Sequence, residues 1–317
     1  MNSILITGGT GMIGKALTKI LLEKGYRVII LTRNKAKAQK FIAQKEDESD
    51  LIRYAEWNTS KNIIDEDAIA TADYIVHLAG AGVSDKRWTK KRKQEIVNSR
   101  TYSGKLIADS LKKIPNHVKA VISASAIGWY NPKFSIKENE NGHTEDEPAD
   151  DSFLGQTCKD WEKSIERVKL LGKRLVKFRT GIVLSNDGGA FPEFKKPLHF
   201  GLATILGSGK QIISWVHIDD LVKMYIEAIE NEKFSGVYNA VAPHPVSNKE
   251  FVLRLAKIMK GNFFILLRVP SFVLKFVLGE MSIEVLKSTA VSCSKIQKQG
   301  FTFQYPEIGK ALQQLIG

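Results

Sequence analysis

Glycines are concentrated close to the first residue of the chain. Gly8, Gly11 and Gly14 stand in the spacing G-x-x-G-x-x-G, between a short apolar run and a stretch of helix-forming residues. Such glycines permit a tight turn, a close approach of the backbone to a diphosphate, and close packing of the helix on the strand. The free N–H groups of a helix N-terminus also bind phosphates. The spacing therefore predicts a dinucleotide-binding turn, and a glycine-rich turn without a ligand is the alternative.

The second apolar run ends at Arg33, which indicates the kind of dinucleotide. NAD sites usually place Asp or Glu here, where it binds the ribose 2′-hydroxyl. Arginine would instead attract the 2′-phosphate of NADP(H), so NADP(H) is favoured over NAD(H). Alternatively, Arg33 stacks on the adenine or faces solvent. In the glycine turn, the residues expected to contact the cofactor are Gly8, Thr10, Gly11, Met12, Ile13 and Gly14.

Three later apolar runs, residues 72–83, 119–130 and 173–185, end in small or polar residues. Ligands of open parallel sheets gather at the carboxyl ends of the strands. We therefore expect further cofactor contacts at these ends. The residues concerned are Leu78, Ala79, Gly80, Ser123 and Arg179.

Alternating strands and helices must position these residues. Residues 3–7 are typical of a strand buried on both faces, residues 15–24 carry apolar side chains at helical spacing, and residues 26–34 resemble the next strand. Strands that alternate with helices along the chain predict an α/β fold of the Rossmann type, with a doubly wound parallel sheet. A smaller C-terminal α/β substrate domain is expected to follow.

The length of 317 residues is sufficient for this organisation. We assign residues 1–185 to an NADP-binding Rossmann domain and residues 186–317 mainly to the substrate domain. Residues 211–242 are expected to return to the first domain.

The composition excludes several classes of protein. A hydrophobic content of 43% with 26% charged residues is ordinary for a globular protein, and no apolar run is long enough to span a membrane. The N-terminus lacks the features of a signal peptide, and two distant cysteines form neither a disulfide framework nor a metal-binding spacing. We expect a cytoplasmic protein without a metal or membrane association. The net charge of +13 includes a basic run at residues 85–95, but no nucleic-acid-binding module accompanies it, so nucleic acid is not an expected partner.

Several further motifs together resemble a known family. They are "HLAGA" (77–81), "RWT" (87–89), "SASAIGWY" (123–130), "CKDWE" (158–162), "FRTGIVLS" (178–185), "GSGKQIISW" (207–215) and "SWVHIDDLV" (214–222). Their order is similar to that in extended short-chain dehydrogenase/reductases, and in particular to the atypical "epimerase family proteins" that carry a C-terminal domain of unknown function. The resemblance covers essentially the whole chain. It implies an NADP-type cofactor and oxidoreductase or epimerase chemistry on a substrate that it does not identify.

The resemblance also implies catalytic positions, and here the chain departs from the wider superfamily. Ser125 matches the serine that orients the substrate oxygen. The Tyr-x-x-x-Lys pair that moves the proton would fall at Leu154 and Cys158, and neither residue can do this. Tyr130 and His217 are alternative proton donors, although packing or capping roles are at least as expected for them. Two other interpretations stay open: Cys158 as a nucleophile, and an NADP(H)-binding sensor or regulatory protein without turnover.

A small-molecule substrate is the expected partner, bound by a monomer or homodimer. The candidate substrate-binding residues lie in the motifs around the expected nicotinamide site. They are Arg87, Trp88, Gln211, Trp215 and His217.

Overall fold

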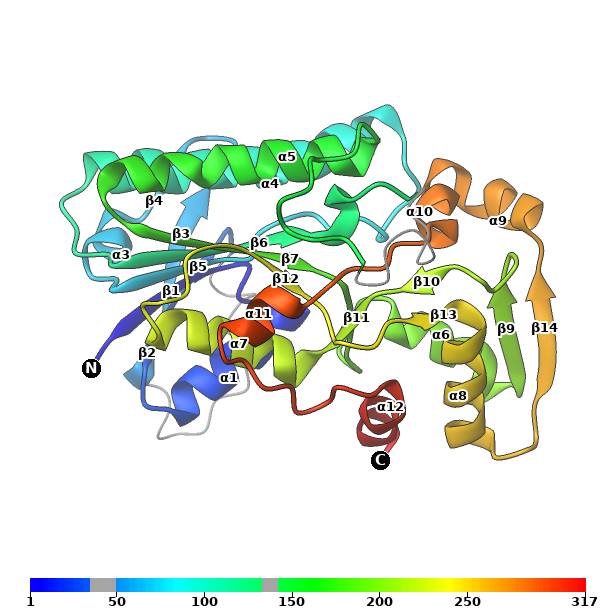
Figure 1. Cartoon of the computed structure of the whole chain (residues 1–317). Coiled ribbons are helices and arrows are strands. Elements are labelled where there is room, and N and C mark those ends of the chain that lie inside the picture. Colours follow the sequence, from blue (N-terminus) through cyan, green and yellow to red (C-terminus); the bar gives the residue numbers. More distant parts are fainter. Residues whose placement is uncertain (35–49, 133–141) are drawn as a thin grey trace.

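A large parallel sheet forms the centre of the molecule, and a smaller unit of short strands and helices lies at one end (Figure 1). The computed structural model describes residues 1–34, 50–132 and 142–317. Neighbouring strands of the large sheet run parallel, except β3 and β4. In spatial order the strands are β12 (Gly236–Ala240), β7 (Arg174–Thr180), β6 (Ala120–Ala126), β5 (Tyr74–His77), β1 (Ser3–Thr7), β2 (Arg27–Thr32), β3 (Ile52–Asn58) and β4 (Ile63–Ile64).

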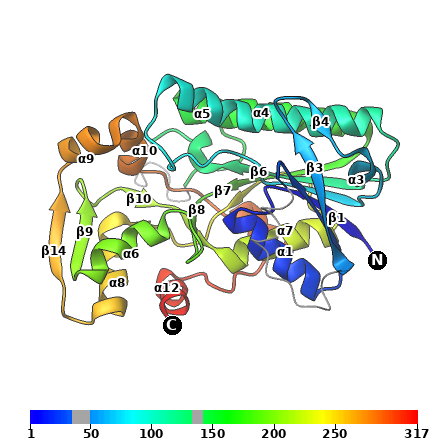
Figure 2. The same cartoon turned by 180° about the vertical axis from the view of Figure 1, so that it is seen from behind.

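Helices cover both faces of this sheet (Figures 1 and 2). One face carries α3 (Glu66–Ala70), α4 (Lys90–Lys113) and α5 (Phe153–Ile165), and the other carries α1 (Met12–Glu23), α7 (Ile218–Glu230) and α11 (Ser294–Lys298). Each face has its own apolar cluster, because successive strand residues point to opposite sides. In β1, Ile4 and Ile6 pack toward α1 and α7, whereas Leu5 packs toward α4. This double burial explains the unbroken apolar run of the first strand and confirms the predicted Rossmann-type fold.

The smaller unit surrounds a third apolar cluster. It contains three two-stranded sheets, β9 with β14, β10 with β13 and β8 with β11. Their bounds are β8 (Ile182–Leu184), β9 (Leu202–Leu206), β10 (Ile212–Ile213), β11 (Trp215–His217), β13 (Val246–Ser247) and β14 (Ile265–Val269). The helices of this part are α6 (Phe191–His199), α8 (Asn248–Lys260), α9 (Ser271–Leu278), α10 (Ser282–Leu286) and α12 (Ile308–Ile316). Short 3-10 helices span Ile127–Trp129, Glu166–Leu171 and Gly279–Met281.

The order of the strands creates a crevice at one edge of the large sheet. From β1 the chain builds outward through β2 and β3, and then returns to place β5 on the other side of β1. The connections leaving β1 and β5 therefore diverge at the carboxyl ends of these strands. Such a reversal is where doubly wound sheets bind ligands.

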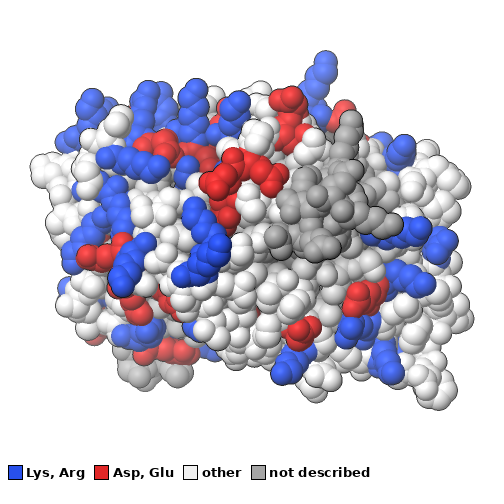
Figure 3. Space-filling view, viewed as in Figure 1, with Lys and Arg blue, Asp and Glu red and all other residues white. Residues whose placement is uncertain are grey.

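Basic side chains are prominent on the surface over α4 and α5, with acidic side chains among them (Figure 3). Part of the basic run at 85–95 has a structural role. Arg92 is buried, donates to the Gly82 carbonyl and pairs with Glu95 at 2.7 Å, while Lys93 pairs with Glu280. These contacts fix the start of α4 against its surroundings. Within the described residues, every helix is too short or too polar to cross a bilayer.

Candidate functional site

The glycine turn brings β1, α1 and the segment after β5 into close contact. Gly8 has a φ of +72°, and a Cβ atom there would lie 2.9 Å from the carbonyl carbon of Leu78. A Cβ atom at Gly14 would lie 2.4 Å from the carbonyl oxygen of Gly8. Real Cβ atoms essentially never make contacts this short with backbone, so both positions require glycine. The turn can thus be this narrow only with these residues.

The N-terminus of α1 provides donors for an anion. Gly11 is the N-cap residue, and among the described residues no side chain caps the helix. The first turn also contains no acidic residue. The first N–H groups of a helix lack intrahelical acceptors and carry partial positive charge. The turn and the uncapped helix therefore fit the diphosphate of a dinucleotide.

A crevice of about 640 Å³ opens beside this helix end. Seven of the twelve predicted cofactor-binding residues line it: Gly8, Thr10, Gly11, Arg33, Leu78, Ala79 and Gly80. The other five lie outside its described lining. Met12 packs near Gly188 and Gly189, Ile13 packs against the core, and Gly14 supports the turn. Ser123 and Arg179 are buried in the large sheet.

Arg33 lines the crevice just beyond the end of β2, between Thr32 and Asn34. Among the residues that the structure describes, none that follows β2 directly is acidic, and Glu56 of β3, which pairs with Thr32, lies outside the lining. The acidic residue in the described lining is Glu95, an exposed residue of α4. Its pKa is lowered chiefly by a hydrogen bond from Arg92, and Arg33 contributes. The end of β2 therefore places a cationic side chain at the crevice.

A buried hydrogen-bond relay holds the segment that follows β5. Thr7 Oγ1 accepts from the amides of Leu78 and Ala79 at 3.1 and 3.2 Å. The Thr7 hydroxyl then donates its hydrogen bond to His77 Nδ1, 2.8 Å away. The neutral ring therefore carries its proton on Nε2, which lies 3.3 Å from Ser103 Oγ. Burial lowers the His77 pKa to about 3, so the imidazole is neutral. The relay fixes the backbone that forms one wall of the crevice.

A second cavity, of about 360 Å³, lies between the large sheet and the smaller unit. The two cavities are neighbours, because residues close together in the chain line one or the other. Ala81 and Ser99 line the crevice, whereas Val83 and Arg100 line the second cavity. Most of its lining is apolar. The apolar side chains include Val83, Ile127, Leu154, Ile182, Phe194, Leu206, Ile212, Ile213, Met281 and Val285. We refer to it as the apolar cavity.

Leu154 and Cys158 of α5 line the apolar cavity. These are the two residues that the resemblance places where the Tyr-x-x-x-Lys pair would stand. Burial raises the pKa of the Cys158 thiol to about 12. Cys158 is therefore a neutral thiol near neutral pH, and an unreactive one. This argues against Cys158 as a nucleophile.

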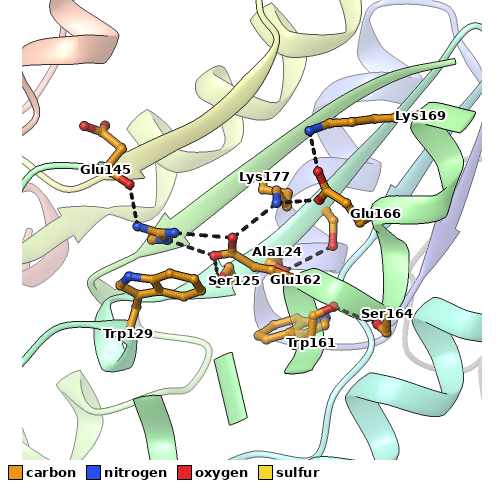
Figure 4. Close-up of polar contacts among 12 residues, drawn as sticks. Ala124, Ser125, Trp129, Glu145, Trp161, Glu162, Ser164, Glu166, Lys169 and Lys177 are labelled. Carbon is orange, nitrogen blue, oxygen red and sulfur yellow. Dashed lines mark hydrogen bonds and ion pairs between the residues drawn. The ribbon is translucent and has the colours of Figure 1, made fainter. Parts of the chain in front are cut away.

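Ser125 belongs to a buried polar network rather than to the cavity wall (Figure 4). Its hydroxyl donates to Glu162 Oε1 at 2.8 Å, and the Arg179 Nε also donates to that oxygen at 2.9 Å. Lys177 Nζ lies 3.3 Å from the other carboxylate oxygen. The guanidinium of Arg179 lies 3.6 Å from the ring centroid of Trp129. Ser125 and Arg179 thus join the large sheet to α5.

The Tyr130 side chain is fully buried and lies outside the described linings of both cavities. Its hydroxyl donates to Asn239 Oδ1 at 2.6 Å and accepts from Arg179 Nη1 at 3.1 Å. Burial raises the phenol pKa above its usual range. The structure therefore places Tyr130 in the polar network and outside the described linings of both cavities.

Among the predicted substrate-binding residues, Gln211 lines the apolar cavity, and its amide donates to the Leu206 carbonyl at 2.9 Å. Trp88 donates to the Val83 carbonyl and Trp215 to that of His244. His217 caps α7 and contacts Gln314, and Arg87 lies beside Gly279. These four lie outside the described lining of the apolar cavity.

Sequence reasoning missed several residues that line the two cavities. Glu95, Asn98, Ser99 and Tyr102 face the crevice from α4, and their spacing of three to four residues could have revealed this shared face. No local signal marks Lys287, which reaches the apolar cavity from the segment after α10. Its position depends on contacts with residues far away in the sequence.

Comparison with known proteins identifies the family. The chain is 35% identical over 316 residues to the epimerase family protein SSP1921 of Staphylococcus saprophyticus, and the match covers 100% of both chains. The chain belongs to the epimerase family proteins. The epimerase family protein YfhF of Bacillus subtilis is 34% identical over 99% of the present chain and 98% of its own length.

Two family models match parts of this epimerase family protein. The NAD dependent epimerase/dehydratase family covers residues 4–151, and a domain of unknown function (DUF1731) covers residues 269–315. Lys287 therefore lies in the second matched region.

Solved structures show the same fold. Human epimerase family protein SDR39U1, crystallised with NADPH, superposes with a TM-score of 0.83 at 28% identity, over 99% of both chains. UDP-glucuronic acid 4-epimerase from Bacillus cereus, in complex with UDP-glucuronic acid and NAD, has a TM-score of 0.78 at 21% identity, over 99% of this chain and 98% of its own. The second likeness concerns the fold alone.

Proposed function

We propose that this epimerase family protein is an NADP(H)-dependent oxidoreductase or epimerase-like enzyme acting on a small molecule. The observation that carries the proposal is the adjacency of the crevice and the apolar cavity. The crevice offers uncapped helix N–H groups and Arg33, and the apolar cavity adjoins it. When bound, the nicotinamide would supply hydride transfer.

The residues of the chain would then have distinct roles. The glycine turn and the N-terminus of α1 would hold the diphosphate, and Arg33 would bind the 2′-phosphate. The relay from Thr7 through His77 would hold the wall at Leu78 and Ala79. The apolar lining would exclude water from the reacting groups. The NADPH in the human relative supports the choice of cofactor.

A second candidate is an NADP(H)-binding sensor or regulatory protein without turnover. Leu154 and Cys158 favour it, because they line the apolar cavity at the positions where the superfamily has its proton-relay pair. Neither side chain can relay a proton there, since Leu154 has none to give and Cys158 is a neutral thiol whose pKa burial raises to about 12.

Deuterium transfer separates the two candidates. The protein is incubated with NADPH deuterated at C4, in either configuration, and a panel of aldehydes and ketones, and products are analysed by mass spectrometry. An enzyme gives a product that is heavier by one mass unit than the product made with unlabelled NADPH. The Arg33→Ala substitution should lower the rate of this reaction with NADPH more than with NADH. NADPH binding with no deuterated product across the panel favours the sensor. Equal effects of Arg33→Ala on both cofactors would refute the assignment of the 2′-phosphate site.

A further inference from the structure

Lys287 is a buried cation in the wall of the apolar cavity. Its side chain is 6% exposed, and its Nζ atom has no hydrogen-bond partner among the described residues. The carboxylate that faces it is Glu284, with Oε2 3.9 Å away, beyond hydrogen-bond distance. A buried ammonium without a hydrogen-bond acceptor is costly, so such a group is usually satisfied by a ligand or a partner.

Arg100 is a second buried cation in the same wall. Its Nη1 atom donates to the carbonyl oxygens of Ala81 and Ile96, at 3.0 and 2.9 Å, and its guanidinium lies over the ring of Trp161. No carboxylate lies within ion-pair distance of it in the described parts of the chain. The contacts of Arg100 hold the guanidinium in place but leave its charge without a counterion.

The two cations act on the same region of the apolar cavity. Both lower the pKa of the Cys158 thiol, whereas burial, which has the largest effect, and the Glu162 carboxylate raise it. Glu284 also lines the cavity, and burial is the main cause of its raised pKa. Two cations therefore share the wall with one carboxylate, and an anion would be attracted.

We propose that Lys287 and Arg100 form an anion subsite in the apolar cavity, and that the substrate is a small apolar molecule carrying one carboxylate. The inference rests on the proposed function, because it takes the occupant of this cavity to be the substrate. A cavity of 360 Å³ with mainly aliphatic walls suits a compact acid. It offers little polar surface to the diphosphate, sugar and base of a sugar nucleotide.

The test compares acids with their neutral amides. Calorimetry at pH 7.5 measures 4-phenylbutyrate against 4-phenylbutyramide, octanoate against octanamide, and cyclohexylacetate against cyclohexylacetamide, with and without NADPH. We expect at least one acid to bind at least tenfold tighter than its amide. Lys287→Met should abolish that preference, leave the affinity for NADPH within twofold, and leave Tm unchanged or higher, since it removes a buried charge without a hydrogen bond.

Lys275→Met is the matched control, because Lys275 is an exposed lysine of α9 in the same C-terminal region. It should retain the preference for the acid. Lys287→Gln provides a second test if the methionine variant does not fold. The proposal is overturned if no acid binds tighter than its amide, or if the preference for the acid survives both substitutions of Lys287. It is also overturned if these substitutions lower the affinity for NADPH instead, which would assign the Lys287 cation to the cofactor's diphosphate. Failure of NADPH to bind would refute the proposed function, while the measurements without cofactor would still test the subsite.

Discussion

Replacing Glu162 with glutamine is expected to destabilise the protein by about 3 kcal/mol or more. The Glu162 side chain is 6% exposed and pairs with Arg179, which is 3% exposed, and with Lys177, which is 8% exposed. Removing one partner of a buried ion pair typically costs about 3–5 kcal/mol, because the other charge stays buried. Lys177 keeps Glu166 at 2.7 Å, so the loss falls mainly on Arg179 and lies toward the lower end of this range.

Urea and thermal unfolding measure this effect. At an unfolding entropy of about 2 cal/mol/K per residue, a loss of about 3 kcal/mol should lower the Tm of this 317-residue chain by roughly 4–5 °C. Glu166→Gln is the matched control, since it removes the other carboxylate of Lys177 but at a side chain that is 42% exposed. Its cost should stay below about 1 kcal/mol because solvent screens the pair. Equal losses for the two variants, or an unchanged Tm for Glu162→Gln, would refute the role of the buried network.

Three further predictions test other parts of the structure. Gly14→Ala puts a Cβ atom 2.4 Å from the Gly8 carbonyl oxygen, so it should lower the free energy of unfolding in urea by about 1–3 kcal/mol. It should also lower the affinity for NADPH measured by calorimetry. Wild-type values for both quantities would be inconsistent with the tight turn. The His77 pKa is about 3 in the folded state and about 6.5 when unfolded, so the unfolded chain takes up the proton first and stability falls as the pH drops through this window. Relative to His77→Gln, the wild type should lose up to about 1.4 kcal/mol per pH unit there in urea titrations, and parallel pH profiles would show that His77 is not held neutral. Cys158, with a pKa of about 12, should react with iodoacetamide at pH 7.5 at least about a hundredfold more slowly in the native than in the urea-unfolded protein, as followed by peptide mass spectrometry, and similar rates would show that the thiol is accessible and ionised.

The fold and the crevice beside α1 could be predicted from the sequence because their signals are local. The glycine spacing, the apolar runs buried on both faces and the small residues after each strand all lie within short stretches. The place of Arg33 at the end of β2 could be predicted because the apolar run of this strand stops just before it. These features are set by backbone geometry, which nearby residues determine.

The catalytic candidates show where local signals are insufficient. Ser125 and Tyr130 lie near the end of β6, as expected, but their hydroxyl groups are hydrogen-bonded to Glu162 of α5 and to Asn239 of β12. Neither partner is near them in sequence. Lys287 likewise approaches Cys158 only through the packing of the C-terminal region. Side-chain direction at a strand end depends on which distant residue offers a hydrogen bond or a charge.

The central claim is that main-chain amides at the N-terminus of α1 hold a dinucleotide diphosphate. Gly11→Asp tests it directly, because Gly11 is the N-cap residue and its φ of −80° is open to other residues. An aspartate is a favourable N-cap but carries a negative charge where the diphosphate would lie. Its Cβ atom would lie 3.3 Å from the Gly8 carbonyl oxygen, so the turn must adjust by a few tenths of an ångström.

Calorimetry with NADPH on ligand-stripped protein, together with the Tm, is the decisive measurement. We predict that the wild type binds NADPH and that Gly11→Asp loses at least about a hundredfold in affinity, while its Tm stays close to that of the wild type. Gly11→Asn, a neutral N-cap of the same size, should lose less affinity than Gly11→Asp. No binding by the wild type, or equal affinities of the wild type and Gly11→Asp, would contradict the claim.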